Sequence, residues 1–199
     1  MRPLNLLFVG DELTSAYGDA RALGWVGRVM AHTRLDPVYP PITWASLPVL
    51  GETTARLAER WALEAGRRLV AGADNRLVLG IGAADLETGA SSARSRLNLA
   101  NVLDGARTEH LECFVVGPPP LPRYDQAAVE RLSDALAEVC ARRAVPYVDT
   151  FHPLLGHEQW STDLAVTGGT HPGQAGYGLL TWLVLHRGWY EWLGLPQQA

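Results

Sequence analysis

The chain has 199 residues, enough to bury a sizeable core, and we expect one domain spanning residues 1–199. Its apolar content of 47% and its net charge of −4 are ordinary for an α/β protein. Nucleic-acid-binding domains are usually basic, so this acidic balance argues against a nucleic-acid partner.

Membrane segments and cysteine frameworks are also not expected. No apolar run reaches the ~18 residues of a membrane span, and the N-terminus leads directly into an apolar segment rather than a signal peptide. Cys113 and Cys140 fall in a predicted strand and a predicted helix, with no disulfide or metal-binding spacing. We therefore predict a cytoplasmic protein with no metal site and no cofactor.

Short apolar runs alternate with longer helical patterns along the chain. Strands are predicted at residues 6–9, 42–46, 77–81, 111–116 and 146–149. Helices are predicted at residues 23–32, 53–71, 93–107, 126–143 and 175–192. This alternation predicts a five-stranded parallel sheet with helices on both faces, which is an α/β class three-layer α/β/α sandwich.

Two helices have identifiable apolar positions. In the second helix the expected core residues are Leu57, Trp61, Leu69 and Val70. In the last helix Trp182, Trp189 and Trp192 are spaced by seven and three, which places them on one helical face. Core packing is the expected role of these tryptophans, and a homodimer surface is the alternative.

Polar and glycine-rich motifs follow the predicted strands. Ligands in open parallel sheets bind beyond the carboxyl ends of the strands, so these loops are where a site is expected. Four blocks stand there in chain order, Gly10-Asp11-Glu12-Leu13-Thr14, Gly51-Glu52-Thr53-Thr54, Gly82-Ala83-Ala84-Asp85 and His171-Pro172. Gly117-Pro118-Pro119-Pro120 and Val148-Asp149-Thr150 follow the fourth and fifth strands.

In this order the blocks resemble the SGNH (GDSL-type) hydrolases, a family of esterases, lipases and acylhydrolases. The resemblance spans about residues 5 to 185 and implies a flavodoxin-like SGNH hydrolase fold. It also implies a small-molecule partner, either an acyl-ester-like substrate or another small ligand.

The resemblance implies five functional positions, and two of them carry the family's residue. The nucleophilic serine corresponds to Glu12, and the proton-accepting histidine to His171. The oxyanion-hole glycine and asparagine correspond to Gly51 and Ala84, and the aspartate that orients the histidine corresponds to Gly168. Nucleophile, one oxyanion donor and the orienting acid are thus replaced together, which removes most of the usual machinery.

Glu12 leaves three alternatives open. It can form an ion pair with His171 that closes the former site. It can act in catalysis, either as a carboxylate nucleophile with His171 activating water or as a general base. It can also recognise a cationic or hydroxyl-bearing ligand.

Neighbouring polar residues are expected to be structural. Asp11 suits an Asx-type hydrogen bond in the turn. Asp85 resembles the aspartate that follows the asparagine in the family, and it is likewise expected to be structural. Asp163 can replace the missing orienting aspartate only if the loop at residues 165–170 folds back on itself. The hydroxyls that offer a substitute nucleophile fit turns or caps better; they belong to Thr14, Ser15 and Thr170.

The simultaneous loss of three positions predicts an SGNH-like protein without catalysis, which binds a small ligand or a partner. The alternative is an active ester or acyl hydrolase that uses Glu12 and His171.

Overall fold

The computed structural model describes residues 2–33 and 41–196. Five strands form one sheet in the order β2-β1-β3-β4-β5, and every neighbouring pair is parallel. The strands are β1 Leu4–Gly10, β2 Ile42–Pro48, β3 Asp74–Gly80, β4 Glu112–Val116 and β5 Tyr147–Val148. The predicted five-stranded parallel sheet is therefore confirmed.

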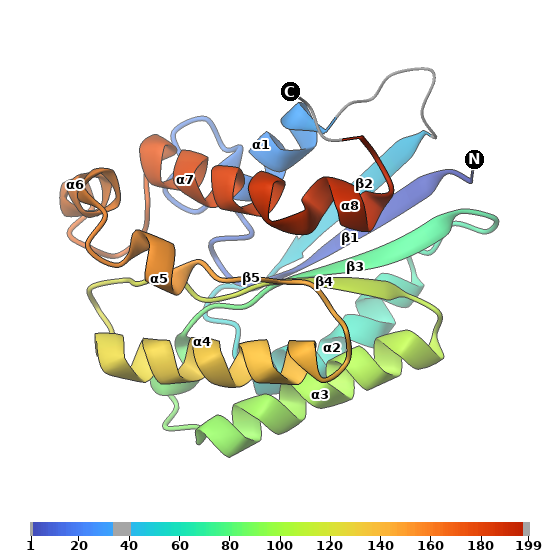
Figure 1. The fold of residues 1–199 in the computed structure, drawn as a ribbon, viewed down its shortest axis with the longest axis horizontal. Coiled ribbons are helices and arrows are strands. Elements are labelled where there is room, and N and C mark those ends of the chain that lie inside the picture. Colours follow the sequence, from blue (N-terminus) through green and yellow to red (C-terminus); the bar gives the residue numbers. More distant parts are fainter. Residues whose placement is uncertain (1, 34–40, 197–199) are drawn as a thin grey trace.

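Helices cover both faces of the sheet (Figure 1). The longer helices are α1 Gly24–His32, α2 Thr54–Gly66, α3 Ser92–Thr108, α4 Gln126–Ala141, α6 Glu158–Val166 and α7 Gln174–Val184. Two single-turn helices, α5 Phe151–Leu154 and α8 Tyr190–Leu193, the 3₁₀ turn η1 Ala84–Leu86 and the irregular segment η2 Leu185–Trp189 complete the set. Helices α1, α7 and α8 lie on one face and α2, α3 and α4 on the other, so the predicted α/β/α sandwich is also confirmed. No described helix has both the length and the apolar character needed to cross a membrane.

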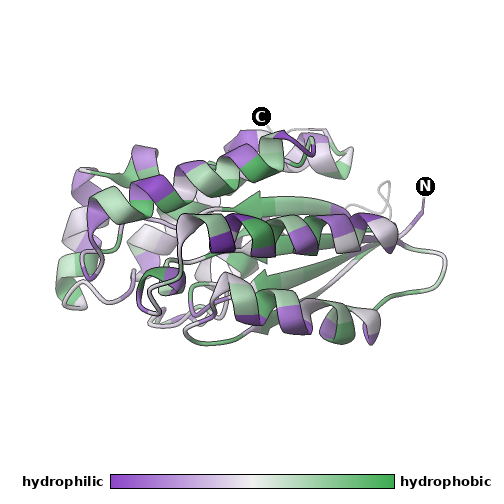
Figure 2. Ribbon diagram, turned by 90° about the horizontal axis from the view of Figure 1, so that it is seen from below, coloured by the Kyte–Doolittle hydropathy of each residue, from purple (hydrophilic) through white to green (hydrophobic). Residues whose placement is uncertain are grey.

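The core lies between the sheet and its two helical layers. All seven residues of β1 are buried, as expected for a central parallel strand. Phe8 of β1 packs edge-on against Trp25 of α1, with 5.8 Å between ring centroids, and lies 6.1 Å from the ring of Trp189. In Figure 2 the strands are accordingly coloured mainly as hydrophobic, whereas hydrophobic and hydrophilic residues alternate along the helices.

The strand order places a topological switch point at β1. The chain leaves β1 for β2 on one side and then crosses back to β3 on the other. The loops after β1 and β3 therefore diverge at the carboxyl edge, leaving room for a ligand there. Glu12 follows β1 at this edge.

The second helix is shorter than the sequence predicts. It ends at Gly66, so Leu69 and Val70 lie beyond it and are 40% and 44% exposed instead of buried. The side-chain amide of Asn75 accepts from the N–H of Val70 and donates to its carbonyl, which holds this segment as a turn. Leu57 and Trp61 are buried as predicted.

The segment after β5 contains α5 and α6, which the sequence reading did not identify. These helices are short, and α6 shows only a weak separation of apolar and polar faces along Glu158–Val166. Its N-terminus is capped by His157, whose ring accepts from the N–H of Trp160, a capping residue that is outside the usual set.

The predicted single C-terminal helix is interrupted. After α7 the backbone leaves helical geometry at Arg187 and Gly188, whose φ of 93° is readily adopted only by glycine. The helical periodicity does not carry across this break, so the three tryptophans do not share one face. Trp189 is fully buried, whereas Trp182 is 55% exposed and stacks on His186.

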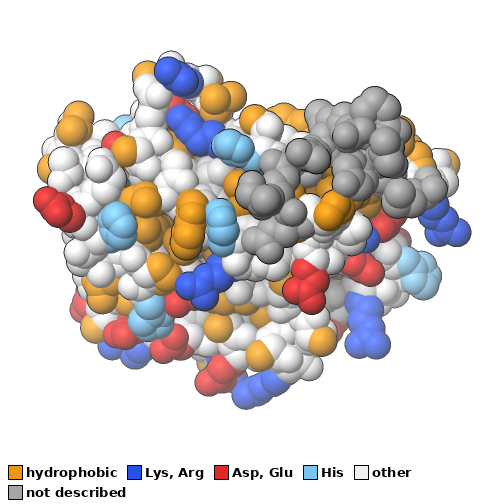
Figure 3. Space-filling view, turned by 45° about the horizontal axis from the view of Figure 1, so that its top comes forward, with side chains coloured by type: hydrophobic (Ala, Val, Ile, Leu, Met, Phe, Trp, Pro, Cys, Tyr) orange, Lys and Arg blue, Asp and Glu red, His pale blue; other side chains and the backbone are white. Residues whose placement is uncertain are grey.

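Hydrophobic and histidine side chains consequently stand side by side on the α7 side of the molecule (Figure 3). The core-packing prediction is right for Trp189, whose indole N–H donates to Thr33, and wrong for Trp182. A homodimer through this surface stays a prediction.

Candidate active site

The turn after β1 is built by Asp11 and presents Glu12. The Asp11 carboxylate accepts from the N–H of Leu13 at 3.0 Å, the Asx-type hydrogen bond that the sequence predicted. The backbone carbonyl of Glu12 accepts from both the N–H and the hydroxyl of Ser15. These bonds fix the backbone of Glu12 and leave its side chain free to enter the site.

The Glu12 carboxylate is held from two sides. Its Oε2 accepts from the N–H of Gly51 at 2.9 Å, and its Oε1 lies 2.5 Å from Nη2 of Arg123. Burial by itself would raise the pKa of Glu12, but hydrogen bonds from Gly51 and Arg123 and the Arg123 charge lower it below the ordinary value. Glu12 is therefore a stabilised carboxylate with only 8% of its surface exposed.

The ion pair expected between Glu12 and His171 does not occur among the described residues. The partner of Glu12 is Arg123, in the loop after β4. The sequence reading missed Arg123 because a single arginine after a proline-rich loop belongs to no motif. Its position at the carboxyl edge, following β4, was the one available signal.

His171 lies against the loop that follows Glu12. The ring of Tyr17 meets it edge-on, with 5.0 Å between centroids. Gly18 is in direct contact with it, since a Cβ at Gly18 would come within 1.9 Å of Nδ1. Nδ1 itself is 3.3 Å from the carbonyl of Pro172, so the ring has a backbone carbonyl as its nearest polar partner.

The acid predicted as a substitute for the orienting aspartate has another role. Asp163 accepts from the N–H groups of Gly173 and Gly176, at 2.5 and 2.9 Å, and thereby caps the N-terminus of α7. Gly168, at the position of the family's aspartate, adopts a left-handed φ of 65° and is exposed. In the described part of the chain, no carboxylate pairs with His171.

The oxyanion-hole-like residues lie in the loops after β2 and β3. Gly51 directs its N–H at Glu12, and Ala84 is buried in η1 without a side-chain donor. Asp85, next to Ala84, accepts from the N–H and hydroxyl of Thr54, at 2.7 and 2.6 Å, and from the hydroxyl of Ser95. These bonds join the starts of α2 and α3, which confirms the structural role predicted for Asp85.

The three candidate substitute hydroxyls occupy different environments. Thr14 Oγ1 is buried and has no hydrogen-bond partner among the described residues. Ser15 donates to the carbonyl of Glu12, and Thr170 donates to the carbonyl of Thr167. None of these three hydroxyls is hydrogen-bonded to His171 in the residues that the structure describes, so none has an activating base.

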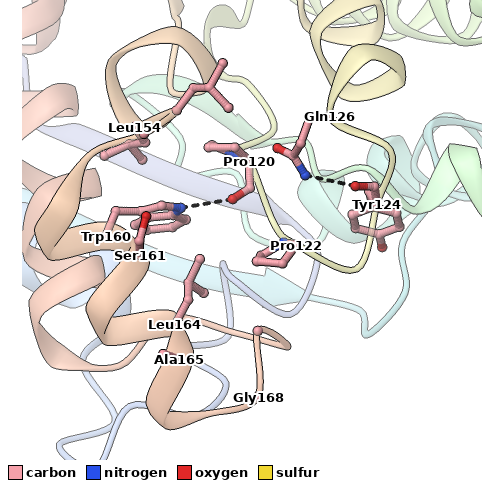
Figure 4. Close-up of a pocket in the computed structure, with 13 residues that line it drawn as sticks. Pro120, Pro122, Tyr124, Gln126, Leu154, Trp160, Ser161, Leu164, Ala165 and Gly168 are labelled. Carbon is pink, nitrogen blue, oxygen red and sulfur yellow. Dashed lines mark hydrogen bonds between the residues drawn. The ribbon is translucent and has the colours of Figure 1, made fainter.

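Two hollows flank this site. A cavity of about 370 Å³ opens beside Glu12, and its walls are formed by Glu12, Tyr17, Leu50, Gly51, Glu87, Arg123 and Thr170. A larger and more apolar cavity of about 550 Å³ lies between the loop after β4 and the segment α5–α6 (Figure 4). Its apolar walls come mainly from Pro120, Pro122, Leu154, Trp160 and Leu164.

The two hollows share two walls, the loop around residues 120–126 and the turn at 168–170. In the apolar hollow, the indole N–H of Trp160 donates to the carbonyl of Pro120, which fixes both walls (Figure 4). Volumes of this size accommodate small organic ligands. In the described ranges no group of three or more His, Cys, Asp or Glu side chains is arranged to hold a metal ion.

A parallel α/β/α sandwich with a Gly-Asp turn after β1, a glycine loop after β2 and a His-Pro pair before the last long helix defines the SGNH hydrolase class of fold. The sequence model of the GDSL-like Lipase/Acylhydrolase family matches residues 8–179, and the chain belongs to this family.

Several solved structures share this fold. TesA is 23% identical, with a TM-score of 0.74, covering 92% of this chain and 97% of that one. The lipase/acylhydrolase from Enterococcus faecalis is 22% identical, with a TM-score of 0.72 and full coverage of both chains. An acetylxylan esterase from Geobacillus stearothermophilus is 16% identical, with a TM-score of 0.75, covering 98% and 97%. Among curated proteins, no significant match is found.

Proposed function

We propose that this protein is a non-catalytic member of the GDSL family that binds a small ligand at the former acyl-transfer site. One observation carries the proposal: the Glu12 carboxylate is held by the N–H of Gly51 and the guanidinium of Arg123. The residue at the nucleophile position thus satisfies its own charge within the protein. Glu12 therefore forms part of the wall of the site and has no partner group for a reaction.

The oxyanion site supports the same conclusion. A donor stabilises a transition state only if it is aimed at the charge that develops there. The Gly51 N–H is already bonded to Glu12, and Ala84 supplies no donor. Losing a single oxyanion donor costs about 10²–10³ in rate, so the loss of two together with the serine leaves little capacity for acyl transfer.

The ligand has space in the two adjoining hollows. The charged hollow beside Glu12 suits a polar group, and the apolar hollow suits a hydrocarbon portion. Thr170 and Tyr17 add hydroxyl groups to the charged side. A small amphiphilic molecule matches this arrangement.

Cytoplasmic location and a single-domain organisation stay predictions.

A second candidate is an ester or acyl hydrolase in which Glu12 is a nucleophile or general base with His171. The open hollow beside Glu12 favours it, because an ion pair that only closed the site would leave no room for substrate. The lowered pKa of Glu12 opposes it, because a carboxylate stabilised by Arg123 is a weaker base and a weaker nucleophile.

Hydrolysis of p-nitrophenyl acetate, butyrate and octanoate separates the two candidates. For the wild type and Glu12→Gln we expect the same rate as buffer. Turnover by the wild type that Glu12→Gln abolishes would overturn the proposal, and an acyl mass adduct on Glu12 would identify it as the nucleophile.

A gain-of-function variant provides the positive control. Glu12→Ser, Ala84→Asn and Gly168→Asp together restore the family's residues at the three replaced positions. A side chain at Gly168 meets no atom within 4 Å, and aspartate tolerates a left-handed backbone. We expect this triple variant to hydrolyse at least one of the esters measurably faster than buffer, because it restores the nucleophile, the side-chain oxyanion donor and the orienting acid together.

A further inference from the structure

The hollow beside Glu12 is lined by more negative than positive charges. Its walls contain the carboxylates of Glu12 and Glu87 and one guanidinium, that of Arg123. Arg123 neutralises Glu12, while the carboxylate of Glu87 accepts from the hydroxyl of Tyr124, a neutral partner. Among the described residues Glu87 forms no ion pair, and Arg123, whose charge also acts on Glu87, is one cation beside two carboxylates, so the charged walls carry one net negative charge.

The donors that would hold an anion in this hollow are already in use. The N–H of Gly51 and the guanidinium of Arg123 together form a carboxylate-binding pair, and Glu12 is the carboxylate that occupies it. An anionic ligand must displace Glu12 and also approach Glu87. The substitution at position 12 therefore blocks the anion site and adds a negative charge in one step.

Tyr17 supplies an aromatic wall to the same hollow. Half of its surface is exposed, and the side chain is held in place by edge-on contact with His171 and by the hydrogen bond that its carbonyl accepts from Tyr177. An aromatic ring beside a carboxylate attracts organic cations through both charge and cation–π interaction.

We propose that this hollow selects organic cations and rejects anions of the same shape, and this inference rests on the proposed ligand-binding function. The recognised group is a small alkylammonium, attracted by Glu87 and packed against Tyr17. If the N–H of Gly51 and the guanidinium of Arg123 faced open space, the hollow would instead be expected to prefer anions.

Three probes of nearly equal shape test this selectivity. They are choline, the neutral 3,3-dimethylbutan-1-ol in which carbon replaces nitrogen, and the anion 3,3-dimethylbutanoate. Dissociation constants are measured by NMR titration at pH 8 and low salt. We expect choline to bind about tenfold more tightly than the alcohol, as about 1.4 kcal/mol of charge attraction would give, and the anion to bind more weakly than both.

Two substitutions and one control locate the effect. Glu87→Gln keeps an acceptor for Tyr124 and removes the net negative charge, so the preference for choline over the alcohol should fall to about twofold or less. Glu109→Gln removes the same charge from an exposed position at the C-terminal end of α3 and should leave the preference unchanged. Glu12→Ala frees Gly51 and Arg123, so 3,3-dimethylbutanoate should then bind more tightly than the alcohol.

Equal binding of the three probes to the wild type, tighter binding of the anion, or no binding of choline would each overturn the inference. The same holds if Glu109→Gln reduces the preference as strongly as Glu87→Gln. These outcomes are independent of the ester assays: hydrolysis that depends on Glu12 contradicts the proposed function, whereas absent charge selectivity in an inert protein contradicts only the choice of ligand.

Discussion

Arg123 Nη2 lies 2.5 Å from Glu12 Oε1, and this ion pair joins the loop after β4 to the loop after β1. The side chain of Glu12 is 11% exposed and that of Arg123 is 35% exposed, so the pair lies partly in solvent. The two loops belong to strands separated by β3 in the sheet. The pair therefore holds together the walls of the charged hollow as well as neutralising Glu12.

Arg123→Gln should destabilise the protein, because it leaves the largely buried Glu12 carboxylate without its cation. Breaking a fully buried pair costs about 3–5 kcal/mol, and we expect about 1–2 kcal/mol here because Arg123 is partly screened by solvent. Urea unfolding at pH 7 measures this loss. The matched control is Arg96→Gln, which breaks the surface pair with Glu138 and should cost less than about 1 kcal/mol. Equal losses in the two variants would contradict the structural role of the Glu12 pair.

The pH dependence of the Arg123 variant provides a second readout. Because the pKa of Glu12 is lowered in the folded protein, its contribution to the free energy of unfolding is present above the unfolded value of 4.5 and is lost at lower pH. Arg123→Gln removes part of that lowering. The loss of stability between pH 5 and pH 3 should thus be smaller in the variant than in the wild type.

Asp11 should make the protein less stable as pH rises towards neutrality. Burial raises its pKa to about 7, and the charge of Glu12 adds to this effect, against hydrogen bonds from Leu13 and Thr14. The folded protein thus holds this proton more tightly than the unfolded chain, with its value of 3.8. The resulting stability is complete below pH 3.8 and is lost as pH rises through 7.

Asp11→Asn tests this dependence because asparagine retains an acceptor for Leu13 and cannot ionise. Urea unfolding of both proteins at pH 5, 6, 7 and 8 should show the wild type losing stability relative to the variant by up to a few kcal/mol. Parallel curves over this range would show that Asp11 does not titrate there.

Gly18→Ala should disturb His171 directly. A Cβ at Gly18 would lie 1.9 Å from Nδ1 of His171, and the φ of 82° is itself unfavourable for alanine. Gly89→Ala is the matched control, since Gly89 has a φ of 68° and no atom within 4 Å of its would-be Cβ. We expect about 1 kcal/mol of strain for Gly89→Ala and a further loss of about 1–3 kcal/mol for Gly18→Ala from overpacking. Similar losses of stability in the two variants would mean that His171 moves away from position 18 at no cost in free energy.

Asp163→Ala should reduce stability without changing how the ring of His171 is placed. Removal of a helix cap costs about 0.5–2 kcal/mol, and Asp125→Ala, which uncaps α4 instead of α7, should cost a similar amount. If Asp163 oriented His171, its loss would let the ring turn away from Tyr17, which it now meets edge-on. NMR contacts between the two rings distinguish the roles: a cap leaves them intact in both variants, whereas an orienting acid loses them in Asp163→Ala alone.

The architecture was readable from the sequence because it depends on local patterns. Fully apolar runs such as Leu6–Val9 alternate with helical periods, and this alone indicates a parallel sheet between helices. The sequence-based expectation was wrong where a helix stopped within an apolar pattern. Helix α2 ends at Gly66, before Leu69 and Val70. Gly188 separates Trp182 from Trp189, because its positive φ changes the backbone path without altering the apolar spacing around it.

The sequence alone indicates that a carboxylate follows β1 at the carboxyl edge of the sheet, with Gly51 and His171 in the order of the GDSL family. The contacts of this carboxylate, in contrast, depend on how the chain folds in three dimensions. Glu12 and Arg123 are 111 positions apart, and they meet because β3 brings the loops after β1 and β4 to one edge. Asp163 likewise accepts hydrogen bonds from the N-terminus of α7 and does not pair with His171. A pairing over such a separation depends on strand order and loop path, which no local spacing encodes.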